Sequence, residues 1–303
     1  MQIEINIATR ESSLALWQTN TVVKYLKQLY PDLEINLIPM TTQGDQIQDK
    51  PLREVGGKAL FIKNLEEALL EGRADLAVHS MKDVPALLDD AFEIAAVLPR
   101  ENPLDAWVSH QYLSFESLPL GASIGTSSLR RQSQLLAMRP DLKIVSCRGN
   151  VQTRLNQCKS GESGKFDGIV LAASGLRRLG LEKKINHIFL PEIMLSAAGQ
   201  GAIGIEILSE NQFLKDLLQP LNHGLSHALV NAERAMCRAL GGSCHSPIGA
   251  LAEFHGREFC LRGLVAKPDG TRILKAESMG EDPELLGLEV AQRLLDQGAL
   301  AYL

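Results

Sequence analysis

The chain of 303 residues contains few cysteines, and they follow no pattern typical of a disulfide scaffold or a zinc site. No two of them form a CxxC pair, and only one has a histidine beside it. Zinc sites and disulfide frameworks need closely spaced or evenly paired cysteines. We therefore expect reduced thiols and no metal ligands among the five: Cys147, Cys158, Cys237, Cys244 and Cys260.

The sequence also lacks long apolar runs and an N-terminal export signal. No stretch approaches the roughly 18 consecutive apolar residues that a transmembrane helix needs. The first residues, Met1–Asn6, have neither a basic region nor the apolar segment that follows it in a secretory signal. We therefore expect a cytoplasmic protein that does not interact with membranes.

Aromatic residues and net positive charge are scarce as well. The chain has two Trp, four Tyr and eight Phe, and its net charge is −5. Proteins that bind nucleic acid broadly are basic and often stack bases on aromatic rings, so we expect no nucleic-acid partner. Hydrophobic residues at 45% and charged residues at 22% are ordinary for a globular protein. The length predicts two or three domains.

The first two-thirds of the chain alternates short apolar runs with helical patterns. Ile3–Thr9 is predicted to be a strand and Ser12–Tyr30 a helix, and a similar strand and helix follow at Ser123–Gly125 and Ser128–Met138. Such alternation is typical of a parallel sheet with helices on both faces. We expect two similar α/β domains, each with a doubly wound sheet.

The last 80 residues have a different pattern. A helix over His223–Leu240 precedes three runs with strand character, which are separated by turns typical of hairpins. Asp282 and Pro283 then mark the start of a last helix. This pattern predicts a small α+β domain with an antiparallel sheet, whose strands are Ile248–Phe254, Glu258–Ala266 and Arg272–Ala276.

The segment 125–155 carries a concentrated positive charge. It holds six basic residues and one acid, a net charge of +5, within an acidic protein. Arginine binds carboxylates and phosphates through two parallel hydrogen bonds, and two predicted helix starts in the segment, at Thr126–Ser128 and Gly149–Asn150, favour anions too. The segment predicts an anion site. The alternative is that its arginines coat a solvated helix face.

A second polar turn, His79–Pro85, follows a predicted strand. Its Asp83 is suited to act as a general acid or to stabilise a positive charge that develops in a reaction. The alternative is a surface ion pair between Lys82 and Asp83, and His79 is more typical of a packed residue than of a catalyst.

Two loops leave a functional and an inert interpretation open. The loop Gly241–Pro247 contains Cys244 shortly after two glycines. A cysteine on such a loop is accessible and could act as a nucleophile or an attachment point. The alternative is that Cys244 is inert. Gly44–Lys58 is polar and without periodicity, which is typical of a lid over an active site or of plain disorder.

Together these segments resemble one family, hydroxymethylbilane synthase, also called porphobilinogen deaminase. HSMKDVP at 79–85, GTSSLRRQ at 125–132 and the glycine-rich cysteine loop are specific in combination. The resemblance spans nearly the whole chain. The matching stretches are Ala8–Leu16, Val55–Phe61, His79–Pro85, Gly125–Arg131, Arg148–Arg154, Gly175–Gly180, Gly199–Glu206 and Gly242–Gly249.

The resemblance implies a transferase of porphyrin and heme biosynthesis. Enzymes of this family join four porphobilinogen molecules head to tail, release ammonia and form the linear tetrapyrrole hydroxymethylbilane. The chain grows on a dipyrromethane cofactor, which the resemblance places on Cys244 through a thioether. It also implies a monomer with three domains: 1–98 together with about 199–218, 99–198, and 219–303. The first two would resemble type II periplasmic binding proteins and the third would carry the cofactor.

The resemblance also assigns roles residue by residue. Asp83 matches the catalytic aspartate. The residues matching cofactor contacts are Lys82, Thr126, Ser127, Ser128, Arg130 and Arg131. The residues matching contacts to substrate carboxylates are Arg10, Ser12, Arg148, Arg154 and Arg178.

The sequence departs from the family pattern at a few places. Gln152 and Ser243 stand where glycine is frequent, Ser196 stands where proline is frequent, and Lys159–Phe166 looks like a small insertion. None of these changes removes a reacting group. Two other classes fit less well: a periplasmic-type binding module would not need Cys244, and a nucleic-acid binder would not be acidic outside one segment.

Overall fold

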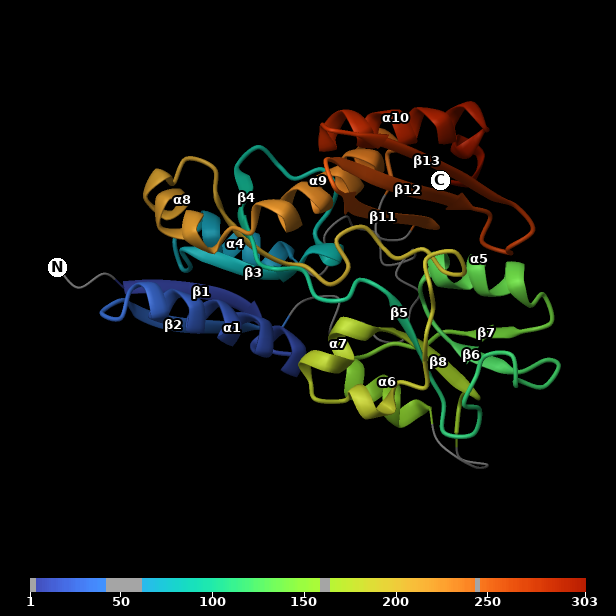
Figure 1. The fold of residues 1–303 in the computed structure, drawn as a ribbon. Coiled ribbons are helices and arrows are strands. Elements are labelled where there is room, and N and C mark those ends of the chain that lie inside the picture. Colours follow the sequence, from blue (N-terminus) through green and yellow to red (C-terminus); the bar gives the residue numbers. More distant parts are fainter. Residues whose placement is uncertain (1–3, 42–61, 159–163, 243–245) are drawn as a thin grey trace. The chain divides into compact units, whose positions relative to one another are not determined.

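The structure, a computed structural model, describes residues 4–41, 62–158, 164–242 and 246–303 (Figure 1). The chain divides into two compact units. Unit 1 comprises Met1–Glu101 with Ala202–Ala228, and unit 2 comprises Asn102–Gly201 with Leu229–Leu303. Cys244 and the whole of Gly44–Lys58 lie outside the described residues, so the predictions for them remain predictions.

Unit 1 is built on a five-stranded sheet in the order β2-β1-β3-β10-β4. β1 is parallel to β2 and β3, whereas β10 is antiparallel to both β3 and β4. A strand from late in the sequence is therefore inserted beside β3. The strands are β1 (Glu4–Arg10), β2 (Glu34–Met40), β3 (Leu76–Ser80), β4 (Phe92–Val97) and β10 (Ile203–Leu208).

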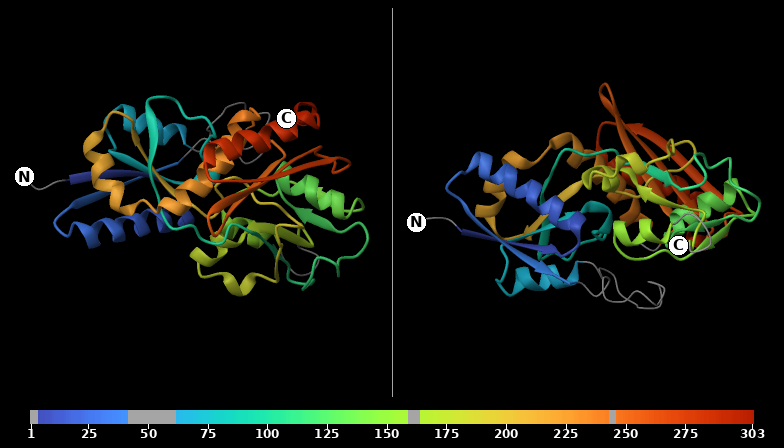
Figure 2. Two further views of the ribbon diagram at one scale, coloured as in Figure 1. Left: turned by 45° about the horizontal axis from the view of Figure 1, so that its top comes forward. Right: turned by 90° about the horizontal axis from the view of Figure 1, so that it is seen from below.

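Helices cover both faces of this sheet. Figure 2 shows α1 (Ser13–Leu29) and α4 (Lys63–Leu70) on opposite sides of the strands. Because side chains alternate along a strand, Leu76 and Val78 of β3 join the core under α1, and Ala77 joins the core under α4. Unit 1 also contains α8 (Gln212–Leu218) and the short 3₁₀ turns η1 (Met81–Asp83) and η3 (Gln219–Leu221).

The sheet of unit 2 repeats this arrangement, in the order β7-β6-β8-β5-β9. β6 is parallel to β7 and β8, and β5 is the antiparallel strand beside β8. The prediction of two similar α/β parts is therefore confirmed. The strands are β5 (Asp105–Val108), β6 (Ser123–Gly125), β7 (Lys143–Val145), β8 (Gly168–Ala172) and β9 (His187–Ile188); the helices are α5 (Leu129–Met138), α6 (Val151–Gln157), α7 (Ala173–Arg178) and the 3₁₀ turn η2 (Glu182–Lys184).

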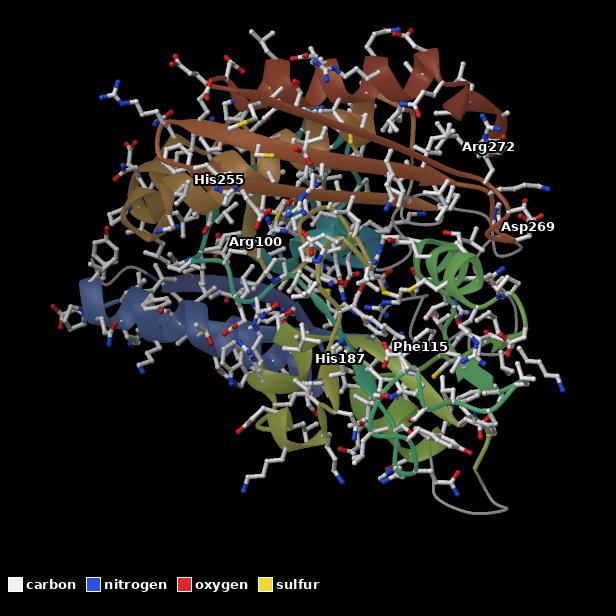
Figure 3. All side chains as sticks on the ribbon, turned by 45° about the vertical axis from the view of Figure 1, so that its right-hand side comes forward. Arg100, Phe115, His187, His255, Asp269 and Arg272 are labelled. Atoms are coloured by element: carbon white, nitrogen blue, oxygen red, sulfur yellow. The ribbon has the colours of Figure 1, made fainter. Side chains whose placement is uncertain are left out.

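The C-terminal part is an antiparallel sheet in the order β11-β12-β13, as predicted. Asp269 and Arg272 lie in the turn between its last two strands (Figure 3). Asp282 caps the last helix by accepting hydrogen bonds from the backbone N–H groups of Glu284 and Leu285. The elements are α9 (Gly224–Ala239), β11 (Ile248–His255), β12 (Glu258–Ala266), β13 (Ile273–Gly280), α10 (Pro283–Asp296) and η4 (Ala299–Tyr302).

Buried polar contacts join this C-terminal sheet to the rest of unit 2. The carboxylate of Glu233, on α9, accepts hydrogen bonds from Gly199 N at 2.7 Å and Ala252 N at 2.8 Å. The backbone of Ala250 donates to Ser196 O at 2.8 Å. These contacts give a physical reason why residues 229–303 form one compact unit with residues 102–201. The finer division into three domains remains a prediction.

Candidate active site

The carboxyl ends of β1 and β3 bring two predicted site residues together in unit 1. Parallel neighbouring strands end at the same edge of a sheet, where ligands of α/β proteins bind. Arg10 is the last residue of β1, and Asp83 lies in η1, directly after β3. Arg10 Nη1 lies 3.7 Å from Asp83 Oδ2, and about a third of the Asp83 side chain is exposed. The Asp83 carboxylate is therefore paired and still accessible.

Backbone and side-chain contacts fix the turn that carries Asp83. Met81 N donates to Ala202 O of the neighbouring segment at 3.0 Å. The Ser80 hydroxyl is held by the amide of Gln18, on α1, at 2.7 Å. Lys82 is half-buried in the same turn.

The Ser12 hydroxyl accepts from Ala15 N at 3.3 Å. Ser12 is thus the N-cap of α1.

The hydroxyl residues before α5 organise their own turn in unit 2. Thr126 Oγ1 accepts from Ser128 N at 3.2 Å, and Ser128 Oγ accepts from Arg131 N at 3.4 Å as the N-cap of α5. Ser127 Oγ lies 2.9 Å from Ser146 Oγ, which ties the turn to the segment after β7. Thr126 is buried, Ser128 is half-buried and Ser127 is exposed, so Ser127 has the greatest solvent access of the three.

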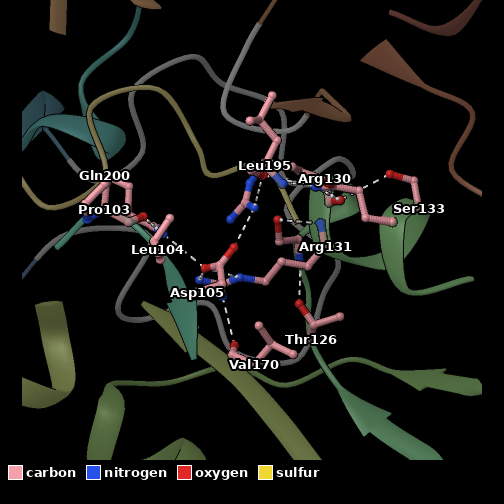
Figure 4. A network of polar contacts seen from close by, with 12 residues as sticks. Pro103, Leu104, Asp105, Thr126, Arg130, Arg131, Ser133, Val170, Leu195 and Gln200 are labelled. Atoms are coloured by element: carbon pink, nitrogen blue, oxygen red, sulfur yellow. Dashed lines mark hydrogen bonds and ion pairs between the residues drawn. The ribbon is translucent and has the colours of Figure 1, made fainter. Parts of the chain in front are cut away.

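Arg130 and Arg131 are buried around one carboxylate (Figure 4). Asp105 Oδ2 accepts from Arg130 Nη1 at 2.6 Å, and Asp105 Oδ1 accepts from Arg131 Nη2 at 2.7 Å. Burial alone would raise the pKa of Asp105, but the two guanidinium groups outweigh it and lower the pKa well below its usual range. For these two arginines the alternative of a solvated helix face is wrong. The three charges leave a net +1 in the interior.

Asp105 is a functional candidate that the sequence analysis missed. Its Oδ1 also accepts from Gln200 Nε2 at 3.0 Å, so it connects the arginines to the segment that leads back to unit 1. Arg130 Nη1 donates further to Leu195 O at 2.7 Å. A signal was present in the sequence: Asp105 begins an otherwise apolar strand, and a buried carboxylate needs partners.

The remaining predicted arginines lie at three further places in unit 2. Arg148 follows β7 and is half-buried, and its burial lowers the pKa of its guanidinium. Arg154 Nε, on α6, donates to Gly149 O at 2.8 Å. Arg178, on α7, is buried and its Nη2 donates to Gly201 O at 2.6 Å. The structure therefore brings Arg130 and Arg131 together directly, and places the other three after β7, within α6 and at the end of α7.

The four cysteines within the described residues are free thiols with raised pKa values. Burial is the largest cause in each case, and it raises the pKa of Cys158 to about 11 and that of Cys237 to about 12. A nucleophilic cysteine needs a thiolate and hence a lowered pKa. Cys147, Cys158, Cys237 and Cys260 therefore have the properties of structural residues.

Within the described residues, no helix combines the length and the hydrophobicity needed to cross a bilayer.

Family models match most of the chain. Residues 5–216 match the model described as porphobilinogen deaminase, dipyromethane cofactor binding domain. Residues 227–296 match the porphobilinogen deaminase C-terminal domain.

Curated relatives agree with these models over nearly the full length. The chain is 52% identical to a porphobilinogen deaminase of Neisseria meningitidis serogroup A over 295 residues, which cover 97% of this chain and 94% of the relative. It is 51% identical to that of Chromobacterium violaceum, covering 98% and 96% of the two chains. Among solved structures, it is similar to a methionine-binding protein at 15% identity, with a TM-score of 0.47 and coverage of 74% and 92%.

The matched models leave only short segments of the chain unassigned, and the identities of about 50% extend through both units. The chain therefore belongs to the porphobilinogen deaminase family, transferases of tetrapyrrole synthesis with a dipyrromethane-binding domain.

Proposed function

We propose that this chain joins four porphobilinogen molecules head to tail into hydroxymethylbilane, with Asp83 as the catalytic carboxylate and Cys244 as the attachment point of the dipyrromethane. The observation that carries the proposal is the accessible Asp83 carboxylate beside Arg10, at the ligand-binding edge of the unit 1 sheet. The reaction follows from membership of the family, and the position of Asp83 provides a carboxylate that can stabilise the positive charge formed in that reaction.

The reaction needs a negatively charged group beside the reacting carbon, which becomes positively charged. Loss of ammonia from porphobilinogen leaves a cationic azafulvene, which a pyrrole carbon then attacks to form the new carbon–carbon bond. That pyrrole carbon loses its proton and the ring regains aromaticity. A fixed carboxylate stabilises the cation more strongly than water does, because it needs no reorganisation. Asp83 would lie against the cation, and Arg10 limits how far its side chain can turn.

The arginines and hydroxyl residues singled out in the sequence fit the chemistry of the cofactor and the growing chain. Each pyrrole brings two carboxylates, so the site must neutralise many negative charges. We propose that the cofactor carboxylates are held by Arg130 and Arg131 with Lys82, Thr126, Ser127 and Ser128. Those of the substrate are held by Arg148, Arg154 and Arg178 with Arg10 and Ser12. When bound, the dipyrromethane supplies the terminal pyrrole that accepts the next unit.

Replacing Asp83 by asparagine tests the catalytic role. Asp83→Asn keeps the shape of the side chain but removes the charge, so we expect a folded protein whose turnover falls on the order of a hundredfold or more. Steady-state kinetics with porphobilinogen measure this. Asp90→Asn, an exposed aspartate of the same unit, serves as the matched control and should retain normal turnover. Near-normal turnover of the Asp83 variant would reject the role.

Arg148 offers the cleanest test of carboxylate binding, because Arg130 and Arg131 also hold the fold together through Asp105. Arg148→Leu should raise KM for porphobilinogen by roughly tenfold or more, the usual effect of losing one charged hydrogen-bonding partner. Arg257→Leu, in the exposed β11–β12 turn, is the control for a lost surface charge. An unchanged KM in both variants would show that Arg148 only covers a helix start.

A cytoplasmic location, a monomeric state and the absence of a nucleic-acid partner complete the proposal. They derive from the composition and from the family resemblance. Light scattering of the purified protein at micromolar concentration decides the oligomeric state, since a dimer doubles the measured mass.

A further inference from the structure

We propose that His79 and Glu206, a buried pair behind the catalytic turn, are positioning residues that hold the Asp83 turn in place. The inference rests on the catalytic role proposed for Asp83. No step of the proposed reaction uses either residue, and neither is accessible to a ligand, since the exposed fractions of their side chains are 3% and 0%.

The turn begins where β3 ends, so the side chains at that end fix its origin. Side chains alternate along the strand, and each of its last two residues contacts a different partner. Ser80 contacts Gln18, on α1. His79 points to the other face, where its Nε2 lies 2.9 Å from Glu206 Oε2, on β10. The strand that leads to Asp83 is thus held from both sides.

The Glu206 carboxylate depends on this contact. Its second oxygen, Oε1, is buried and has no hydrogen-bond partner among the described residues. A buried carboxylate without partners is costly, so the imidazole N–H of His79 is the donor that makes its burial tolerable. The pair therefore has a defined geometry, which constrains the end of β3 against β10.

The strand register places β10 so that it controls the first residue of the turn as well. Gly204 lies opposite His79. A Cβ at Gly204 would lie 2.1 Å from Met81 Sδ, so any other residue there would force the buried side chain of Met81, the first residue of η1, to shift. On its other edge, β10 pairs with β4 through a bulge between Ile205 and Glu206. Bulges are frequent beside functional sites, where they redirect side chains.

A third titratable group, Glu66 on α4, interacts electrostatically with both members of the pair, and also with Glu67 and with Asp89, before β4. Burial and the negative charge of Glu206 raise the pKa of Glu66 to about 7, and His79 acts in the opposite direction. The negative charges that act on Glu66 include Glu206 itself, and His79 is the group in this set that offsets them.

The test separates positioning from stability by comparing three variants. Glu206→Ala removes the hydrogen-bond partner of His79 and should lower kcat roughly tenfold with KM nearly unchanged. The expected loss is moderate because a full displacement of a catalytic group by about 1 Å lowers the rate by roughly a hundredfold. Glu206→Gln retains an acceptor for His79 and should restore kcat to within about twofold. Tyr30→Phe, which removes the hydrogen bond to Leu217 O elsewhere in unit 1, should lower the melting temperature without changing kcat.

A fourth variant keeps the test decisive if Glu206→Ala does not fold. His79→Leu/Glu206→Leu replaces both partners by apolar groups, which is often nearly neutral for stability. It should fold and show the same loss of kcat. Folded protein with wild-type kcat from either variant would overturn the inference.

A double-mutant cycle with Asp83→Asn distinguishes failure of the inference from failure of the catalytic assignment. If the pair acts through Asp83, adding Glu206→Ala or the double leucine change to Asp83→Asn should cause no further loss of kcat. A fully additive loss would overturn the positioning role while leaving the role of Asp83 intact. Near-normal turnover of Asp83→Asn alone would overturn both.

Discussion

Cys244→Ser protein is expected to have no measurable turnover and no bound pyrrole. The thiolate of a cysteine attacks an electrophilic carbon readily and leaves a stable carbon–sulfur bond, whereas a serine hydroxyl at neutral pH is a far weaker nucleophile. Without the covalent primer no chain can begin, so the loss should be complete rather than partial.

Mass spectrometry measures this effect directly. Wild-type protein should exceed its sequence mass by two linked pyrrole units and should turn red with an acidic aldehyde reagent for pyrroles; the variant should do neither. Cys260→Ala is the control, because Cys260 is buried in β12 with a raised thiol pKa. Wild-type protein that is unmodified yet fully active would disprove the attachment.

Asp105→Asn is expected to be the most destabilising of the substitutions considered. The change leaves Arg130 and Arg131 buried without a counter-charge. Removing one partner of a buried ion pair typically lowers the free energy of unfolding by about 3–5 kcal/mol. Urea denaturation of the purified protein measures the free energy of unfolding. Glu71→Gln, which breaks an exposed pair with Arg73, should change it little.

The same residue gives the stability a defined dependence on pH. The pKa of Asp105 is lowered in the folded protein, so the stabilisation is fully present above its unfolded value near pH 4 and is lost as the pH falls further. Wild-type protein should therefore lose stability faster than Asp105→Asn between about pH 4 and pH 2. Parallel pH curves for the two proteins would show that the fold does not lower the pKa of Asp105.

Much of the fold could be predicted because its signals are local. Hydrophobic alternation placed strands and helices, and hydroxyl or acidic residues marked helix starts. Ser12, Ser128 and Asp282 are indeed N-caps that bond to backbone groups within three residues. Contacts of such short range depend little on the rest of the chain, so a sequence pattern determines them.

The candidate site could be predicted only in part. The turn with Asp83 and the arginine-rich segment were visible as residue types at strand ends. That Arg130 and Arg131 are buried around Asp105 was not visible, because the carboxylate comes 25 residues earlier and on a strand that runs antiparallel to its neighbour. The sequence favoured a cluster of accessible arginines, whereas in the structure these two are buried and paired with Asp105.

The sequence by itself thus determined the class of fold, the elements around each turn and the residues able to do the chemistry. The tertiary structure decided which charges meet. His79 and Glu206 are 127 residues apart and become partners only because the chain returns to unit 1 after residue 201 and forms β10 antiparallel beside β3. Strand order and register determine which residues form such pairs. Hydrophobic periodicity indicates only which face of an element is buried, so it contains no information about these pairs.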